Sequence, residues 1–289
     1  MSGNCKKVYL VTQVGPQKRA DVTNTSSFLS PVFQALPSYL QLSRQEDADI
    51  YLSLFTEGEL DQLVYLLETR PKPTFIFIWD FYFENRQQDD SLVARLLKPY
   101  KDYITIMCPN AGSKLCLESF GFTNVHCVRT FAQYFEGRSV CNRHYVCFAQ
   151  RQYPWDMTAE WGIRACTELN IPYMCNRDKR WTFEQYKDIL SGCSFIATTN
   201  NEASTGGMSL LEAYNLGKPV LFPNSVTQGA NDIFQDRGYR YQFDSYDDLC
   251  YEISQLWMNP PDTDLLDQQA YCSHFSGPAF AGQLKDIIK

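Results

Sequence analysis

The sequence lacks any apolar run long enough to cross a membrane. A membrane-spanning helix needs about 20 consecutive apolar residues, and every hydrophobic run in these 289 residues is shorter. The N-terminal segment MSGNCKKVYLV also lacks the apolar stretch and the small-residue cleavage site of a signal peptide. We therefore expect a cytoplasmic protein with no membrane span.

The sequence also lacks a net positive charge and any cluster of residues with metal-ligand spacing. The 26 bases are outnumbered by 33 acids, giving a formal net charge of −7, so a strongly basic nucleic-acid surface is not the default. The 3 histidines lie far apart, no CxxC occurs, and no Cys/His cluster has zinc spacing. The 11 cysteines lie mostly inside apolar runs, which is typical of buried free thiols in a reducing compartment. We expect no metal site.

The composition is that of a globular protein with material for two cores. Hydrophobic residues make up 44% of the chain and charged residues 20%, which excludes disorder and low-complexity fibres. A typical domain has about 150 residues, so this length predicts about two domains. Aromatic residues reach 15% and can fill both cores.

Short β-branched and aromatic runs alternate with amphipathic stretches in two successive series. In the first series, strands are predicted at 8–12, 49–55, 74–79, 103–108 and 124–128, and helices near 27–42, 57–68, 89–98 and 113–120. In the second, strands are predicted at 145–149, 172–175, 194–199, 220–223 and 239–243, and helices near 158–169, 183–191, 208–216 and 245–258. The alternation predicts an α/β protein with two doubly wound, Rossmann-like parallel sheets.

The two series set the expected domain boundaries. Residues 133–143 have no clear period and separate the series. We therefore expect an N-terminal domain at 1–138 and a C-terminal domain at 139–262. The remaining residues, 263–289, end in an amphipathic helix.

In doubly wound folds the ligand lies outside the carboxyl ends of the strands. Residues that directly follow a predicted strand are therefore candidates for the site. Gly15 follows the first strand and Asp80 the third, while Arg151 follows the first strand of the second series. Lys179 and Trp181 follow the next strand of that series.

The most informative segment is 199–223, TNNEASTGGMSLLEAYNLGKPVLFP. A strand ends there, Gly206 and Gly207 open a helix, and Gly217 closes it. A helix that begins with two glycines presents backbone N–H groups and the positive end of its dipole, which suits a phosphate. Glu212 lies one turn further in, where a carboxylate can accept two hydrogen bonds from a ribose diol. The alternative is a plain glycine-rich turn with an ordinary exposed glutamate.

Residues 207–213 (GMSLLEA) and 217–220 (GKPV) resemble the donor-site signature of the retaining GT-B glycosyltransferases of family 4. Residues 186–196 are similar to the helix and strand that precede this signature in the family. Residues 148–151 (FAQR) are similar to the start of the family's second domain, where an Arg reaches the donor diphosphate. The detailed resemblance covers about residues 144–258, whereas the first half matches only in its order of elements.

The resemblance implies the GT-B arrangement, two Rossmann-like domains with a cleft between them, and a nucleotide-sugar donor. It also implies that the C-terminal helix within 263–289 returns to the first domain. The expected donor-binding residues are Gly15, Arg151, Lys179, Trp181, Gly206, Gly207, Met208, Ser209 and Glu212. Of these, Gly15, Lys179 and Trp181 are included for their positions after predicted strands and the others for the resemblance. Glu202 and Asp80 are the expected catalytic residues. Charge on the leaving diphosphate is then stabilised by backbone N–H groups and basic side chains, with no metal and no cofactor.

Individual roles follow from the resemblance and from position. Glu212 would bind the ribose and Glu202 the hydroxyls of the transferred sugar. Trp181 either packs on the nucleobase or belongs to the core. Asp80 either orients or deprotonates an acceptor hydroxyl, or caps a helix.

Two departures from the family pattern leave assignments open. Nine residues separate Glu202 from Glu212 instead of the usual seven, so Ser204 is an alternative sugar contact. The family also tends to carry a Lys about five residues after the Arg, where this chain has Asp156. The positive charge of this missing Lys could instead come from a base in the loop after the predicted strand 172–175, namely Arg177, Lys179 or Arg180.

The expected function is transfer of a hexose or similar sugar, with retention, from a UDP- or GDP-sugar to a hydroxyl acceptor. The acceptor is left open among a glycan, a lipid, a protein, a small molecule and a hydroxymethylated base of phage-type DNA. The oligomeric state is also open. The main alternative is a catalytically silent binder of nucleotides or sugars with the same fold; an epimerase or a phosphorylase is a further one.

Overall fold

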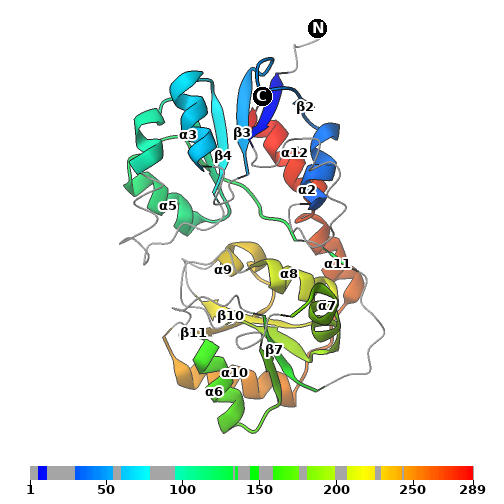
Figure 1. Cartoon of the computed structure of the whole chain (residues 1–289). Helices are drawn as coiled ribbons and strands as arrows, with labels where there is room; N and C mark the ends of the chain where they lie inside the picture. The colour runs from blue at the N-terminus through cyan, green and yellow to red at the C-terminus, as the bar shows by residue number, and fades with distance from the viewer. Residues whose placement is uncertain are drawn as a thin grey trace. The chain divides into compact units, whose positions relative to one another are not determined.

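The structure is a computed structural model of the chain (Figure 1). It describes residues 6–11, 30–54, 60–78, 95–132, 134–135, 144–149, 159–175, 181–198, 207–224, 229–242 and 244–288. No helix in this described part is long and apolar enough to span a membrane.

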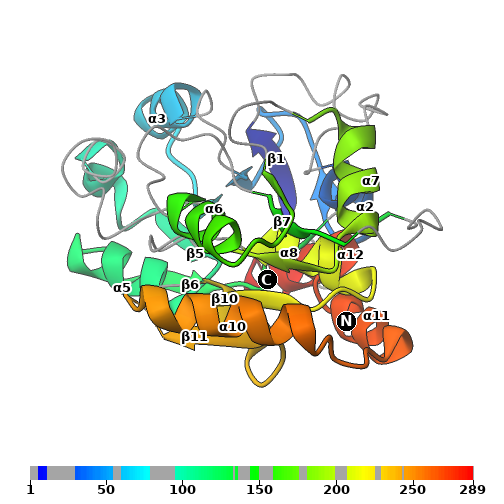
Figure 2. The same cartoon turned by 90° about the horizontal axis from the view of Figure 1, so that it is seen from below.

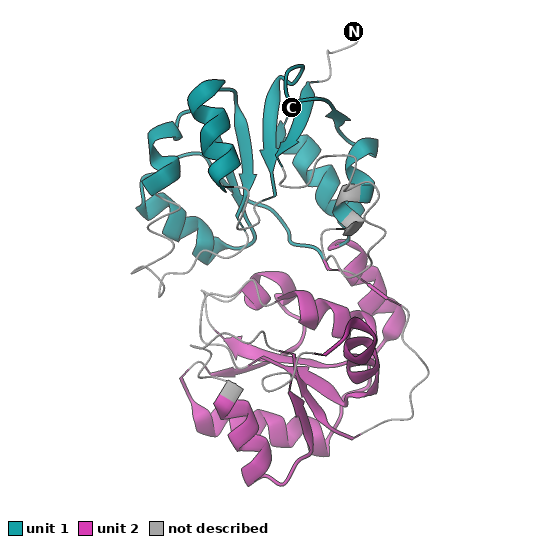
Figure 3. Ribbon diagram, in the orientation of Figure 1, with its two compact units in different colours: residues 1–131, 276–289 teal, residues 132–275 magenta. Residues whose placement is uncertain are grey.

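The chain divides into two compact units (Figure 3). The first unit contains residues 1–131 and 276–289, and the second contains residues 132–275. The last helix, α12 (Gly277–Ile288), therefore belongs to the unit that the N-terminal half of the chain builds.

The first unit is built on a parallel sheet with the described strand order β2-β1-β3-β4-β5-β6. Its strands are β1 (Lys7–Val11), β2 (Gln41–Leu42), β3 (Ile50–Ser53), β4 (Thr74–Phe77), β5 (Ile104–Cys108) and β6 (Val125–Cys127). Both β3 and β4 are buried along their whole length, as expected for strands covered on two faces.

Helices cover both faces of this sheet. Its helical segments are α2 (Ser30–Ala35), α3 (Leu60–Thr69), α5 (Ala111–Ser119), α12 and the 3-10 turns at Leu36–Ser38 and Lys98–Tyr100. Leucines of α3 and α5 pack on one face together with Ile76 and Ile106. On the other face α12 lies beside α2 (Figure 2), and its Phe280 meets Phe77 edge-on at 5.0 Å between ring centroids.

Helix α5 begins with a side-chain cap. Asn110 has extended backbone and directly precedes the helix, and its Oδ1 accepts a hydrogen bond from the Ser113 N–H at 2.7 Å. Such a cap satisfies one of the N–H groups that a helix start leaves without a partner. The Asn110 side chain thus caps the first turn of α5.

The second unit is built on a parallel sheet with the described order β11-β10-β9-β7-β8. Its strands are β7 (Val146–Phe148), β8 (Tyr173–Cys175), β9 (Phe195–Ala197), β10 (Val220–Asn224) and β11 (Tyr239–Gln242). Its helices are α6 (Ala159–Glu168), α7 (Phe183–Gly192), α8 (Gly207–Asn215), α9 (Gly229–Phe234), α10 (Tyr246–Met258) and α11 (Leu265–Ser273).

Alternate strand residues of this unit enter two separate cores. Cys147, Ile196 and Phe222 pack with α7, α8 and α9, whereas Phe148 and Leu221 pack with α6 and α10 on the opposite face (Figure 1). This is the pattern of a buried sheet, whose successive side chains point to opposite faces. The predicted fold class, two doubly wound parallel-sheet units, is confirmed.

Some local predictions were wrong. Residues 41–42, predicted at the end of a helix, form strand β2, and the preceding helical stretch ends in a 3-10 turn that contains Pro37. His126 lies in strand β6, where the apolar residues on either side of it would suggest a core position, but it is exposed and contacts Asn124 at 2.9 Å. The expectation of free thiols, by contrast, agrees with the structure, since the nine described cysteines are free and six of them are buried.

Candidate functional site

The sheet of the second unit has a switch point between β7 and β9. The chain passes from β7 to β8 on one side and then returns to β9 on the other side of β7. Ligands of doubly wound folds bind in the crevice outside the carboxyl ends of such a pair of strands. Helix α8 follows β9, so its first turn lies at this edge.

Gly207, the first residue of α8, packs closely against the Ile233 side chain of α9, which would have to move to admit a larger residue. A Cβ on Gly207 would overlap the Cδ1 of Ile233 on α9. The helix ends at Gly217, which has φ +81°, and the Lys218 N–H then bonds to the Ala213 carbonyl at 3.1 Å. Glycine is favoured at such a left-handed position after a helix. The predicted glycine start and stop of this helix are both present.

Glu212 projects from α8 toward α7, where Tyr186 meets it. The hydroxyl of Tyr186 donates a hydrogen bond to Oε2 of Glu212. Burial, together with the charge of Glu212 and this hydrogen bond, raises the pKa of Tyr186 well above its usual value. Tyr186 therefore keeps its proton and acts as the donor at neutral pH.

Aromatic side chains surround the Tyr186 ring. Trp181 stacks on it with ring centroids 6.5 Å apart and an angle of 29°, and Phe135 meets it edge-on at 6.2 Å. Trp181 is partly buried and packs against the core of the second unit. Directly after it, Thr182 forms a capping box with Gln185, which fixes the start of α7.

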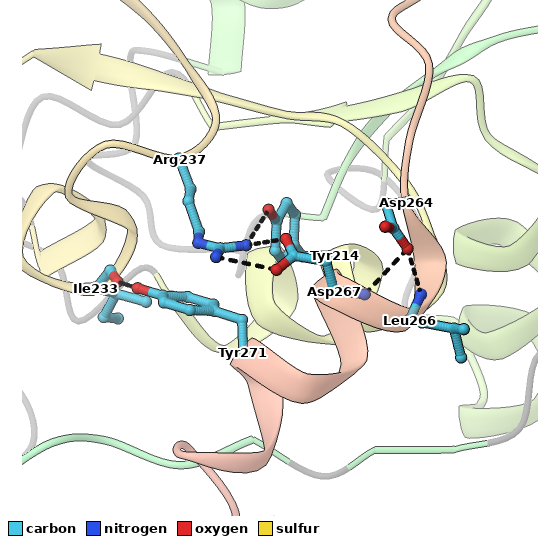
Figure 4. Close-up of polar contacts among 7 residues, drawn as sticks. All are labelled: Tyr214, Ile233, Arg237, Asp264, Leu266, Asp267 and Tyr271. Carbon is cyan, nitrogen blue, oxygen red and sulfur yellow. Dashed lines mark hydrogen bonds and ion pairs between the residues drawn. The ribbon is translucent and has the colours of Figure 1, made fainter.

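A polar cluster fixes α9 and α11 against α8 (Figure 4). Arg237 pairs with both carboxylate oxygens of Asp267 and donates to the Tyr214 hydroxyl at 3.4 Å. Its guanidinium also lies 4.4 Å from the ring centroid of Tyr271. The Tyr271 hydroxyl in turn donates to the Ile233 carbonyl. The cluster thus holds the residue that packs against the start of α8.

Some predicted site residues lie in the described part of the chain and others do not. Gly207 is buried in the first turn of α8, with Met208 and Ser209 partly buried beside it, and Trp181 and Glu212 are both connected through Tyr186. The predicted residues outside the described part are Gly15, Asp80, Arg151, Lys179, Glu202 and Gly206, with the alternatives Ser204, Arg177 and Arg180.

Sequence reasoning did not single out Tyr186, Ile233, Arg237 or Tyr271. Residue 186 lies in the helix that precedes the signature, but the sequence does not indicate which of its faces meets Glu212. Among the described residues, no three His, Cys, Asp or Glu side chains gather closely enough to hold a metal ion.

Comparisons with known proteins agree with this architecture. No protein-family model and no curated protein matches the sequence. Among solved structures, Anabaena HepE with bound UDP and glucose superposes with a TM-score of 0.66 and 13% identity over 99% of both chains. A Rickettsia africae glycosyltransferase gives 0.62 and 10% identity over 99% of this chain and 98% of that one.

Sucrose-phosphate synthase from Thermosynechococcus elongatus gives a TM-score of 0.68 and 9% identity over 84% of this chain and 74% of that one. At these identities the similarity establishes the fold. The chain has the GT-B fold of glycosyltransferases, with two Rossmann-like units.

Proposed function

We propose that the protein is a retaining glycosyltransferase that uses a nucleoside-diphosphate sugar, most simply a UDP- or GDP-sugar. The observation that carries this proposal is the position of α8. This helix begins with Gly207 at the switch point of the second sheet, and its Glu212 projects toward α7. The structural neighbour HepE, solved with UDP and with UDP-glucose, supports UDP as the first nucleotide to test.

In this proposal the second unit holds the donor. Backbone N–H groups at the start of α8 bind the diphosphate, and Arg151 and Lys179 add positive charge as the glycosidic bond breaks. Glu212 accepts the ribose hydroxyls, and Trp181 packs on the nucleobase. Neither a metal nor a cofactor takes part, because these donors stabilise the departing phosphate charge.

The catalytic assignments are Glu202 and Asp80. Glu202 binds hydroxyls of the transferred sugar as positive charge develops at its anomeric carbon. Asp80, in the first unit, orients the acceptor hydroxyl or removes its proton. The acceptor class is a hydroxyl compound, with glycans, lipids, proteins, small molecules and hydroxymethylated DNA all to be offered.

We place the protein in the cytoplasm, where free thiols such as its nine described cysteines persist.

A thermal-shift panel of UDP, GDP, ADP and TDP, with their sugars, tests the donor site. A ligand at 100 times its Kd stabilises the folded state by about 2.7 kcal/mol. Failure of every nucleotide to raise the Tm would refute the proposal. Donor turnover is then followed with EDTA present, and rescue by manganese of an EDTA-sensitive activity would contradict the metal-independent mechanism.

The second candidate is a catalytically silent nucleotide binder of the same fold. It is favoured by the longer spacing from Glu202 to Glu212 and by Asp156 where the family tends to carry a Lys. A silent binder binds the nucleotide but neither transfers the sugar nor hydrolyses the donor when acceptor is absent. Donor hydrolysis above the buffer rate excludes this candidate.

A further inference from the structure

We propose that Tyr186 is a positioning residue that fixes the carboxylate of Glu212 for the ribose of the nucleotide. The proposal rests on the proposed function, since it assumes that Glu212 binds a ribose. It adds a residue on a second helix to the site. The hydrogen bond from the Tyr186 hydroxyl to Oε2 of Glu212 joins α7 to α8 across 26 residues of sequence.

The carboxylate needs such a restraint. A glutamate side chain has three rotatable bonds, and ordering a flexible side chain costs up to about 2 kcal/mol of conformational entropy. A hydrogen bond to a charged acceptor is strong enough to select one arrangement before the ligand arrives. A carboxylate has about four lone-pair sites, and the Tyr186 hydroxyl takes one of them.

The Tyr186 ring is itself held in place, so its hydroxyl is preorganised. Trp181 stacks on the ring and Phe135 meets it edge-on. The ring also packs against the apolar core of the second unit, where a phenylalanine would pack as well. Packing alone therefore does not require the hydroxyl, whereas orientation of Glu212 does. Because Tyr186 keeps its proton, it donates to Glu212 throughout the neutral range.

The test compares two ligands that differ only in the ribose hydroxyls, UDP and 2′,3′-dideoxy-UDP. Their Kd values are measured calorimetrically for the wild-type chain, Tyr186→Phe, Glu212→Ala and the double variant. The matched control is Tyr145→Phe. It removes a hydroxyl of the same core that donates to a backbone carbonyl, that of Ile189 on α7, at 2.8 Å.

We expect Tyr186→Phe to weaken UDP about tenfold, the scale of one charge-assisted hydrogen bond, and to leave dideoxy-UDP unchanged. In the Glu212→Ala background the same substitution adds no further loss, because there is no carboxylate left to position. Tyr145→Phe leaves both affinities unchanged, whatever it does to the Tm. With a nucleotide-sugar donor, Tyr186→Phe raises KM with kcat near the wild-type value.

Two results overturn the inference while leaving the proposed function intact. One is equal weakening of UDP and dideoxy-UDP by Tyr186→Phe, which would indicate a general disturbance of the unit. The other is unchanged UDP affinity in Tyr186→Phe while Glu212→Ala is impaired. Absence of binding of UDP, GDP, ADP and TDP to the wild-type chain would instead reject the proposed function, and the inference with it.

Discussion

Helices α5 and α8 each follow a parallel strand of their own unit, β5 and β9, but their first turns are built differently. Helix α5 is capped by the Asn110 side chain, which accepts from the Ser113 N–H. Helix α8 is preceded by Gly206 and begins with Gly207, neither of which carries a side-chain acceptor. A capped start serves stability, whereas a glycine start leaves its N–H groups to be satisfied by other means. Under the proposed function, α5 has a structural role and α8 binds the ligand.

The largest expected effect is on the glutamate of α8. Glu212→Ala should weaken UDP about 10- to 150-fold, the loss of a charge-assisted hydrogen bond, and raise the donor KM more than it lowers kcat. Glu118→Ala on α5 is the matched control, since Glu118 is an exposed glutamate whose Oε1 lies 3.8 Å from the Nζ of Lys114. Calorimetric titration with UDP measures both, and equal affinities would remove the ribose assignment.

The next effect concerns the glycine start of α8. Gly207→Ala should reduce the free energy of unfolding by about 1–3 kcal/mol, because the new Cβ meets the buried Ile233 side chain. Ile233→Val removes the Cδ1 methyl in the way, so the double variant should recover part of this loss relative to the sum of the single variants. Urea unfolding measures the three values. Additive losses would show that contact with Ile233 is not the reason why Gly207→Ala is less stable.

The cap of α5 should give a smaller and purely structural effect. Asn110→Ala is expected to cost about 1 kcal/mol of unfolding free energy, and Asn110→Ser, which retains a capping oxygen, should cost less. UDP affinity should stay at the wild-type value in both variants. A loss of UDP affinity in Asn110→Ala, measured beside its unfolding curve, would break the division of roles between α5 and α8.

The smallest effect is the pH dependence of the cluster that supports α8. The hydrogen bond from Arg237 lowers the pKa of Asp267. The folded state then binds this proton less readily than the unfolded state, so the pair stabilises the fold above the unfolded pKa of about 3.9. That contribution disappears as the pH falls through the lower, folded value.

Asp267→Asn should accordingly be slightly less stable than the wild type at pH 7 and equal to it in acid. Both side chains are substantially exposed, so solvent keeps the difference small. Urea midpoints at several pH values test the sign. A gap between the two chains that widens on acidification would contradict it.

Local signals explain which parts of this fold could be predicted. Helix α8 was predicted at 208–216 and is found at Gly207–Asn215. It could be predicted because the glycines that mark its two ends are visible in the local sequence. Strand β2 has two residues and exists because it pairs with β1, which no local pattern reveals. The short helix α9 was likewise not predicted. Its start at Gly229 and its packing depend on the strands and helices around it.

The same distinction between local sequence signals and tertiary packing holds for the candidate site. Glu212 and the glycines were recognisable because a contiguous motif carries them. Its partner Tyr186 was not, because their contact depends on how α7 packs against α8. Arg237 and Tyr271 come from different segments, and only the folded unit brings them to Ile233 (Figure 4). A contiguous motif therefore indicates candidate ligand contacts, whereas the residues that pack around them can be identified only from the fold.

The return of α12 to the first unit has a consequence for how the chain is made. Residues 132–275 are interposed in the sequence between the two parts of the first unit. Phe280 of α12 packs against Phe77 and Phe131, so the core of the first unit stays incomplete until this late segment leaves the ribosome. The whole second unit has been synthesised by then. We therefore expect that the second unit can fold while the sheet of the first unit still lacks its last helix, contrary to the usual N-terminal-first order.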